Sequence, residues 1–230
     1  MSLYAIGDLH FSTSVNKPMN IFGGNWNNHE EKIIESWKSK VKKEDTVLVL
    51  GDTSWGINLS EAKSDLDIIS ELEGNKIFIK GNHDYWWTTV TNLNKLYDNC
   101  KFLQTNFYEY EDYAICGGRG WICPNDVKFD SKDEQIYKRE ENRIRISLES
   151  ARKKGYEKII VITHYPPTND KLEESIFTKL YEEYNVEKVI YGHLHGRESF
   201  KMGLKGIRNG VEYILASCDY LNFNLVKILD

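Results

Sequence analysis

Five short motifs built from glycine, acidic residues, asparagine and histidine follow strand-like apolar runs along the chain. They are Gly7-Asp8-Leu9-His10, Gly51-Asp52, Gly81-Asn82-His83-Asp84, Thr163-His164 and Gly192-His193-Leu194-His195. Carboxylate and amide oxygens and imidazole nitrogens are ligands for borderline divalent ions such as Mn²⁺, Fe²⁺ and Zn²⁺. Because five of the six histidines of the chain lie in these motifs, the pattern predicts a metal site with mixed oxygen and nitrogen ligands.

Two of the motifs place possible ligands two residues apart. Side chains with this spacing point to the same side of an extended strand end, so Asp8 and His10 could chelate one ion, and His193 and His195 are spaced alike. The carboxylate of Asp52 could bridge to a second ion. A lone histidine after a strand is typically structural, and the ordered series is what favours a metal site.

The elements that position these motifs follow from the apolar periodicity. Strand-sized runs lie at residues 3–6, 46–50, 76–79, 158–163, 188–191, 211–216 and 225–229, and helical spacing occupies 30–40, 60–72, 133–154 and 172–184. This alternation indicates an α/β fold, and strands without helices near 102–116 and after residue 199 indicate antiparallel additions. The carboxyl ends of strands in open α/β sheets share an edge, where distant motifs can converge.

Two connecting regions complete this outline. In the segment 133–154, Tyr137, Ile144, Leu148 and Ala151 fall on one face, which predicts a helix that faces the core. The segment 11–28 has the composition of a long loop, and long loops in compact domains are often functional, so we expect it at the rim of the site.

The composition is that of a water-soluble globular protein. The 230 residues are 40% apolar, 13% aromatic and 28% charged, and no linker or repeat divides them, so we predict one domain over residues 1–230. A signal peptide and long apolar runs are both absent from the sequence, so we expect a cytoplasmic protein with no membrane partner. The four cysteines show no CxxC spacing, which favours free thiols.

The charge of the chain bears on its partners. A net charge of −5 disfavours nucleic acid as a partner, because duplex binding usually requires a clustered basic face. Nucleic acid stays open as a partner on this evidence, but it is not the favoured one.

The ordered set of five motifs resembles the signature of the calcineurin-like metallophosphoesterase superfamily, in its bacterial single-domain form. The similarity runs from residue 7 to residue 195. It implies an α/β fold of two mixed β-sheets packed as a sandwich and flanked by helices, with two divalent metal ions, Mn²⁺, Fe²⁺/Fe³⁺ or Zn²⁺. By motif, the first ion would be bound by Asp8, His10 and His195, the second by Asn82, His164 and His193, and both by Asp52.

The resemblance also implies a reaction. A metal-bound hydroxide would hydrolyse a phosphomonoester or phosphodiester, most simply a small phosphate ester. His83, which is not a metal ligand in the family, would stabilise the transition state or protonate the leaving group. Asp84 would either orient that imidazole or cap a helix at 85–94. The alternatives are a non-catalytic metal-binding scaffold and a nuclease of the same superfamily.

Several further residues are candidates for substrate contact. Arg119 lies in a glycine-rich turn after a strand at 113–116 and could reach a phosphate, or it is simply a solvated arginine. His29 could contact the site from the long loop, and Tyr220 and Asn222 could lie at its rim. Trp55 stands where the family more often has a polar residue. Trp55 and four other tryptophans either shape the substrate site or pack its loops. The other four are Trp26, Trp86, Trp87 and Trp121.

Overall fold

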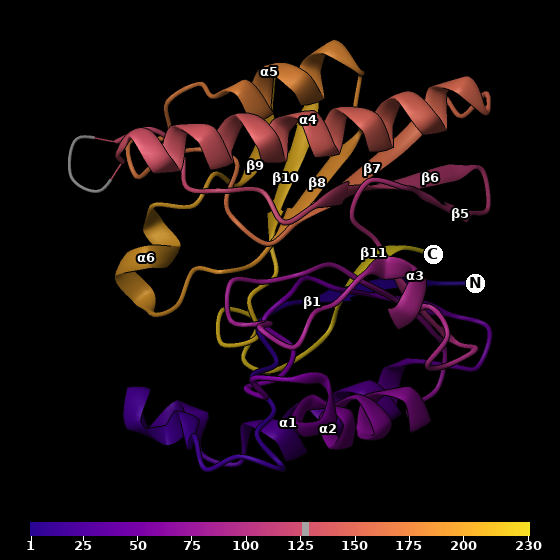
Figure 1. The fold of residues 1–230 in the computed structure, drawn as a ribbon, viewed down its shortest axis with the longest axis vertical. Coiled ribbons are helices and arrows are strands. Elements are labelled where there is room, and N and C mark those ends of the chain that lie inside the picture. The colour runs from indigo at the N-terminus through magenta and orange to yellow at the C-terminus, as the bar shows by residue number, and fades with distance from the viewer. Residues whose placement is uncertain (126–128) are drawn as a thin grey trace.

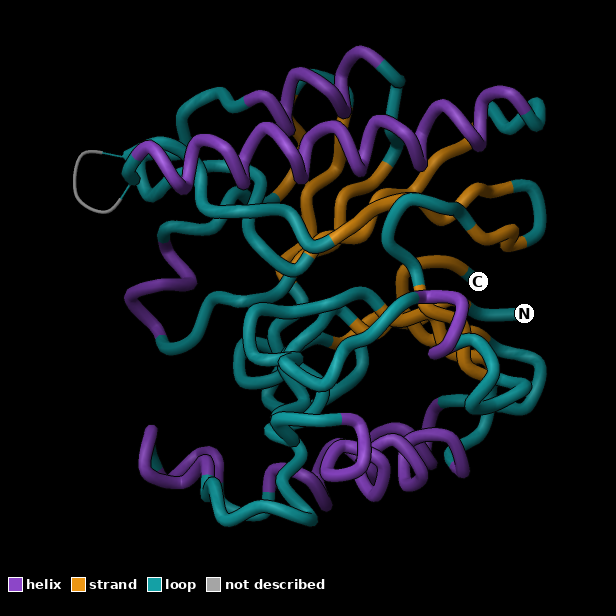
Figure 2. The backbone as a smooth tube through the Cα atoms, in the orientation of Figure 1, coloured by secondary structure: helices purple, strands orange, loops and turns teal. Residues whose placement is uncertain are grey.

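The computed structural model describes residues 1–125 and 129–230 and arranges them in four layers (Figure 1). Helices form the two outer layers and strands the two inner ones, as the colours of Figure 2 show. The strands belong to one sheet of five and one sheet of six, both with parallel and antiparallel pairs. The predicted fold of two mixed sheets flanked by helices is therefore confirmed.

The first sheet has the order β11-β1-β2-β3-β4. Strands β1 to β4 run parallel, and β11 pairs antiparallel with β1. Every residue of β1 and β2 is buried, which is typical of parallel strands that are covered on both faces. The strands are β1 (Leu3–Ile6), β2 (Thr46–Val49), β3 (Asn75–Phe78), β4 (Cys100–Phe102) and β11 (Val226–Leu229).

The second sheet has the order β5-β6-β7-β8-β10-β9. Its four central strands are parallel, and the edge strands β5 and β9 are antiparallel to their neighbours. The strands are β5 (Tyr108–Tyr110), β6 (Tyr113–Gly118), β7 (Lys158–Thr163), β8 (Lys188–Tyr191), β9 (Gly206–Arg208) and β10 (Val211–Leu215).

The helices cover the outer faces of the sheets. Apolar residues of α1 (His29–Lys40) and α2 (Leu59–Glu71) pack on the first sheet, and those of α4 (Ser131–Lys153) and α5 (Ile176–Glu183) pack on the second. A third apolar cluster lies between the two sheets. The four residues predicted to face the core from 133–154 are all buried. The short helices are η1 (Met19–Phe22), η2 (Gly24–Trp26), α3 (Val90–Leu93) and α6 (Arg197–Lys201).

The seven predicted strands all form, three with their predicted bounds and four within one residue of them. The helix predicted at 172–184 begins at Ile176, because Ser175 caps it through a capping box. The antiparallel prediction is right for β5, β9 and β11 and wrong for β4, β6 and β10, which continue the parallel sheets. The division of the chain into one domain stays a prediction.

The two sheets are joined near one end of β1. Gly7 forms an isolated parallel bridge with Ser217, and the backbone N–H of Gly7 donates to the carbonyl of Ala216 at 2.7 Å. The N–H of Cys218 in turn donates to the carbonyl of Gly7 at 3.0 Å. The segment after β10 is thereby fixed beside the segment after β1.

Two further predictions can be compared with the structure. The four cysteines are free and buried, as expected from their spacing. Within residues 1–125 and 129–230, no helix has both the length and the apolar character that crossing a membrane would require.

Candidate metal centre

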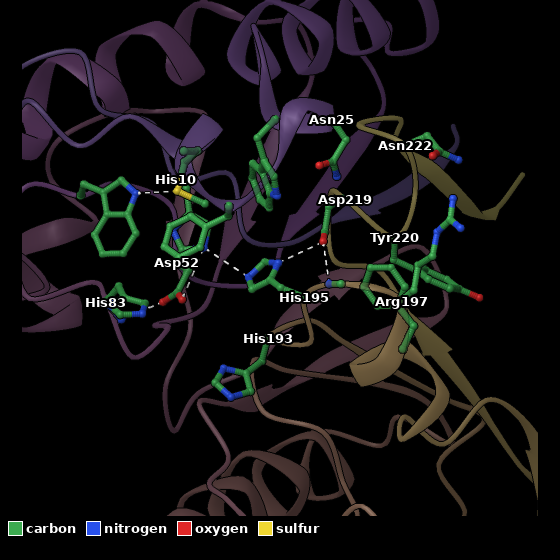
Figure 3. A pocket seen from close by; sticks show the side chains of 16 residues that line it. His10, Asn25, Asp52, His83, His193, His195, Arg197, Asp219, Tyr220 and Asn222 are labelled. Carbon is green, nitrogen blue, oxygen red and sulfur yellow. Dashed lines mark hydrogen bonds and ion pairs between the residues drawn. The ribbon is translucent and has the colours of Figure 1, made fainter.

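The predicted ligands meet where the parallel strands of both sheets end. Those of the first sheet follow β1, β2 and β3, and those of the second follow β7 and β8. They lie in and beneath an open cavity of about 860 Å³, which we call the metal cleft. In Figure 3, His10, Asp52, His83, His193 and His195 lie along one part of the cleft, and Arg197, Tyr220 and Asn222 lie across from them.

A first group of ligand atoms comes from Asp8, His10 and His195. These atoms all lie within 4.8 Å of one another. The Nε2 atoms of the two imidazoles are 3.4 Å apart, and His195 Nε2 is 3.6 Å from Asp8 Oδ1. Two ring nitrogens and a carboxylate oxygen thus face a common point.

A second group is centred on His164. Its Nε2 atom lies 2.8 Å from Asn82 Oδ1 and 3.1 Å from His193 Nδ1. Asp52 Oδ2 is 3.5 Å from the same nitrogen and 3.8 Å from His10 Nε2, which belongs to the first group. The Asp52 carboxylate therefore lies between the two groups.

Hydrogen bonds behind the rings determine which imidazole nitrogen faces the cleft. His164 Nδ1 is 2.9 Å from the carbonyl oxygen of Leu50, and His195 Nδ1 is 2.9 Å from Asp219 Oδ1. When each ring is neutral, its Nδ1–H can donate to that oxygen, which leaves the lone pair of Nε2 free for a metal ion. This is the arrangement that outer hydrogen bonds give to histidine ligands of metals.

The pKa values of the two carboxyl groups of the site, Asp8 and Asp52, are shifted in opposite directions. Burial alone would raise the pKa of Asp8, but the attraction of His195, His164 and His10 outweighs it and lowers that pKa. Burial and repulsion by the ionised Asp8 raise the pKa of Asp52. Two buried carboxyl groups that disfavour each other's charge form a site that a cation would stabilise.

The pKa values of two imidazoles of the second sheet, His193 and His195, are also shifted in opposite directions. Burial and repulsion by His164 lower the pKa of His193 to about 3, so its ring is neutral, as a metal ligand must be. Burial also disfavours charge on His195, but attraction to Asp8 and Asp219 prevails and raises its pKa to about 10. These opposite directions reflect how closely the acidic groups approach each ring.

The backbone at four of these motif positions adopts the left-handed conformation, which is uncommon for residues other than glycine. The four residues are Asp8 (φ 60°), His10 (φ 49°), Asp52 (φ 50°) and His193 (φ 70°). Hydrogen bonds maintain the conformation: the N–H of His193 donates to both carboxylate oxygens of Asp8, at 3.0 and 2.9 Å. Concentrated strain of this kind is typical of functional sites.

Close backbone approach explains two of the motif glycines. A Cβ atom on Gly192 would lie 2.5 Å from Asp8 Oδ2, and one on Gly81 would lie 2.1 Å from Asp52 Oδ1. Only glycine fits at both positions without displacing the carboxylates. The motif glycines thus bring neighbouring strand ends close enough for their side chains to converge.

The donor set fits divalent metal ions. It combines buried carboxylates, an amide oxygen and imidazole nitrogens, which suits ions of the Mn²⁺, Fe²⁺ and Zn²⁺ class. The Nε2 atoms of His10 and His195 face each other at 3.4 Å beside the Asp8 carboxylate, which is what a ligand set presents before an ion completes it.

His83 lies at the side of the metal cleft, half-buried, beside the ligand atoms. Its backbone N–H donates to Asp52 Oδ1 at 2.8 Å, and its ring lies 4.5 Å from that of Trp55 between centroids. Burial and the neighbouring histidines lower its pKa. The imidazole is therefore close to the ligand set without belonging to either group described above.

Asp84 is fully buried, and its carboxylate accepts hydrogen bonds from the backbone of the motifs. Its carboxylate accepts hydrogen bonds from the N–H groups of Asp52 at 2.9 Å, Thr53 at 2.9 Å and Gly81 at 2.7 Å, and from the indole of Trp86 at 3.0 Å. Burial and the charge of Asp52 raise its pKa to about 6. These bonds join the loops after β2 and β3.

The predicted helix at 85–94, and with it the predicted cap at Asp84, is wrong. Only Val90–Leu93 is helical, and Thr89 caps it by accepting from the N–H of Asn92. Trp86 and Trp87 instead enter the apolar core of the first sheet, which holds the preceding residues out of a helix. The carboxylate of Asp84 accepts from backbone and indole N–H groups, as described above. The role predicted for it in orienting the His83 ring stays a prediction.

Arg119 lies outside the set of residues that line the metal cleft. Its guanidinium is 3.5 Å from Glu140 on α4 and stacks at 4.5 Å from the ring of Trp121, and only 18% of the side chain is exposed. The interpretation as a solvated arginine is therefore wrong. Its backbone carbonyl accepts from the N–H of His164 at 3.1 Å, so the residue supports a ligand from behind.

His29 is buried behind the cleft at the start of α1. Its Nε2 atom lies 3.1 Å from the carbonyl of Leu9 and 3.2 Å from that of His10. It is not among the described residues that line the cleft. The side chain holds the loop that carries His10.

The walls of the cleft are formed by segments of which some were predicted from the sequence and some were not. The loop at 11–28 lines it as predicted, through Met19, Phe22, Asn25 and Trp26, and Tyr220 and Asn222 also line it. Of the five tryptophans considered as candidates above, Trp26 and Trp55 line the cleft, and Trp55 stacks on His10 at 4.9 Å between ring centroids. Helix α6 adds Arg197 and Phe200, which the sequence analysis did not consider.

Asp219 is the functional residue that sequence reasoning missed. It accepts from His195 Nδ1 at 2.9 Å and from the N–H of Gly196 at 3.0 Å, as the dashed lines of Figure 3 show. The strand-end rule could have found it, because Cys218-Asp219 follows the apolar run at 211–216. The dipeptide lacks the glycine and histidine that marked the other motifs.

Comparison with known proteins supports this interpretation of fold and site. The model of the family "Calcineurin-like phosphoesterase" matches residues 1–197. Uncharacterized protein MJ1445 of Methanocaldococcus jannaschii is 31% identical over 83 residues, which cover 36% of this chain and 46% of that protein. The chain thus matches less than half of the length of this relative.

Two solved structures share the fold over almost their whole length. The protein TT1561 of Thermus thermophilus has a TM-score of 0.60 at 12% identity, covering 99% of this chain and 97% of that one. Phosphopantetheinyl Hydrolase (PptH) of Mycobacterium tuberculosis has a TM-score of 0.55 at 14% identity, covering 99% and 95%. With the family match and the Asp/His cluster, these findings show that the chain belongs to the calcineurin-like phosphoesterases, a family of metal-dependent phosphoesterases.

Proposed function

We propose that the chain hydrolyses a small phosphate ester at a centre of two divalent ions. The observation that carries this proposal is the position of the Asp52 carboxylate, 3.8 Å from His10 Nε2 and 3.5 Å from His164 Nε2. One ion would be held by Asp8, His10 and His195, the other by Asn82, His164 and His193, with Asp52 shared. Bound ions would supply positive charge that polarises the phosphoryl group and lowers the pKa of water.

His83 is the proposed acid and hydrogen-bond donor of the reaction. Its backbone N–H bonds Asp52, so the ring lies beside the ligand groups, and the tilted contact with the ring of Trp55 limits its motion. A donor in this position would protonate the leaving alkoxide or stabilise charge on a phosphoryl oxygen. Asp84 would be a positioning residue, because it holds the loops that carry Asp52 and Asn82.

The walls of the cleft favour an ester whose alcohol part is aromatic or apolar. Phe22, Trp26 and Trp55 line the side formed by the first sheet, and Phe200 lines the opposite side. Flat rings of this kind bury apolar groups and stack on aromatic ones. Arg197, on the same wall as Phe200, could pair with a second negative charge of the substrate.

The test is a hydrolysis assay of the full chain loaded with Mn²⁺, Fe²⁺ or Zn²⁺. Substrates are p-nitrophenyl phosphate, bis(p-nitrophenyl) phosphate, methyl phosphate, cyclic nucleotides and DNA, with chelated protein as the control. We expect metal-dependent turnover of an aryl ester well above that of methyl phosphate. Absence of turnover with every metal would favour a non-catalytic scaffold, and preferential cleavage of DNA would favour a nuclease.

A further inference from the structure

A second cavity, of about 280 Å³, lies between α4 and the loops that follow β3, β4 and β6. We call it the arginine pocket, because four basic residues line it and one acidic residue accompanies them. The basic residues are Lys80, Arg119, Arg139 and Arg143, and the acidic one is Glu140. No described residue lines both this pocket and the metal cleft.

The charge of the pocket exceeds what its acidic residue requires. Glu140 is fully buried, and its three ion pairs all use Oε1: with Arg143 at 2.6 Å, Arg119 at 3.5 Å and Arg139 at 3.7 Å. One close arginine would neutralise a buried carboxylate. Among the described residues of the lining, the other cations converge without a matching acid, and such convergence is repulsive unless an anion is present.

Hydrogen bonding in the pocket is also incomplete. Among the described residues, Trp87 Nε1, Arg119 Nε and Glu140 Oε2 are buried without hydrogen-bond partners. Buried donors are rarely left unpaired in folded proteins. Trp87 is only 8% exposed, so its indole N–H has little access to solvent. Two N–H donors and one carboxylate oxygen around the pocket thus lack partners among the described residues, so its polar groups do not satisfy one another.

We propose that the arginine pocket binds a phosphate-class oxyanion, either inorganic phosphate or the phosphate group of a larger molecule. Guanidinium groups match phosphate oxygens with paired hydrogen bonds, and an excess of three positive charges suits a multiply charged anion better than a single carboxylate. The site needs no metal ion and goes beyond the proposed hydrolysis.

The pocket is connected to the metal cleft through the chain itself. Lys80 and Trp87 line the pocket. Between them in sequence lie His83, which lines the cleft, and Asn82, whose Oδ1 atom contacts His164 in the second ligand group. The carbonyl of Arg119 also accepts from the N–H of His164 at 3.1 Å. An anion that orders these side chains would therefore stiffen the support of the second ligand group.

The test measures phosphate binding to the full chain by isothermal titration calorimetry. Excess chelator keeps metal ions from taking the phosphate, and chloride holds the ionic strength constant. We expect one saturable site. Arg143→Gln should weaken binding at least about tenfold, because a charge-assisted hydrogen bond is lost. Glu140→Gln should tighten binding several-fold, because it removes a competing negative charge.

Arg197→Gln reports binding in the metal cleft instead, because Arg197 lines that cleft. Lys138→Gln is the matched control, since Lys138 is a 70% exposed cation of α4 that pairs with Glu134 and does not line the arginine pocket, so phosphate affinity should stay unchanged. Arg139→Gln, at a side chain that is 53% exposed, should weaken binding about threefold without endangering the fold. The proposal is overturned if no saturable binding occurs, or if Arg197→Gln weakens binding and Arg143→Gln does not.

A second arm of the titration distinguishes the two sources of the phosphate group. Glycerol 3-phosphate and adenosine monophosphate are titrated beside inorganic phosphate. Tighter binding of an ester that is still sensitive to Arg143→Gln assigns the pocket to a group on a larger molecule, and tighter binding of inorganic phosphate assigns it to the free ion. Binding of the esters that is insensitive to both Arg143→Gln and Arg139→Gln contradicts the proposal.

Discussion

The two sheets contribute different chemistry to the metal cleft. The first sheet carries the proposed oxygen ligands, Asp8, Asp52 and Asn82, with His10 as its single proposed imidazole ligand. The second sheet supplies imidazoles alone, from the ends of β7 and β8. The carboxylates of the proposed ligand set therefore come from one side, and the other side contributes ring nitrogens alone. This difference predicts that changes on the first sheet cost more than equivalent changes on the second.

The largest effect is expected for Asp52→Asn. Loss of the carboxylate shared by both ligand groups should release at least one metal ion and lower kcat/KM roughly 10³-fold or more, since several kcal/mol of charge stabilisation are removed. Metal analysis and aryl phosphate hydrolysis measure the two effects. Asp67→Asn, at a partly exposed side chain of α2 that does not line the cleft, is the control. A fully loaded, active Asp52→Asn enzyme would contradict the shared-ligand assignment.

His83→Ala separates chemistry from coordination on the same side of the cleft. The rate should fall roughly 10²- to 10⁴-fold, the usual contribution of an acid–base group. Metal content should stay unchanged, because His83 belongs to neither ligand group. Loss of metal from this variant would instead place His83 among the ligands.

Asp219→Asn tests the second sheet. An amide holds His195 less strongly than a carboxylate does, so metal affinity should fall about 10- to 100-fold with the fold intact. A competition assay with a chelating dye measures this change, and Asn222→Ala at the cleft rim is the control. If Asp219→Asn were as damaging as Asp52→Asn, the proposed division between the two sheets would fail.

The smallest effect is expected at the rim. Phe22→Ala, at a side chain that is 65% exposed, should raise KM for an aryl ester roughly fivefold, equivalent to about 1 kcal/mol of aromatic contact. Phe200→Ala should act similarly from the opposite wall, with kcat unchanged in both. Unequal effects of the two substitutions would show on which sheet's side the alcohol group binds.

Much of the fold and of the metal set could be predicted from local patterns. Parallel strands that are buried on both faces are short continuous apolar runs, and their ends share an edge, so polar motifs after them predict a common site. The positions of Asp8, Asp52 and His164 all followed from this rule. Asp219 obeys the same rule, and it was missed because no glycine or histidine accompanies it.

The remaining errors concern side chains whose partners are distant in sequence. Arg119 follows β6, but its direction depends on Glu140 of α4, which local spacing does not reveal. The stretch after Asp84 has apolar residues at spacings that a helix would also use. Burial of Trp86 and Trp87 in the first core prevails over that local preference, as tertiary packing often does.

The bridge between Gly7 and Ser217 gives the metal centre an order of assembly during translation. Asp8 and His10 leave the ribosome more than 180 residues ahead of His193 and His195, and the Asp219 carboxylate that orients one of these rings follows later still. Domains tend to fold as units during synthesis, and the nascent chain carries five of the seven proposed ligands before His193 is made: Asp8, His10, Asp52, Asn82 and His164. A product truncated just before the segment after β10 would keep all seven proposed ligands but would lack the Asp219 carboxylate that orients His195.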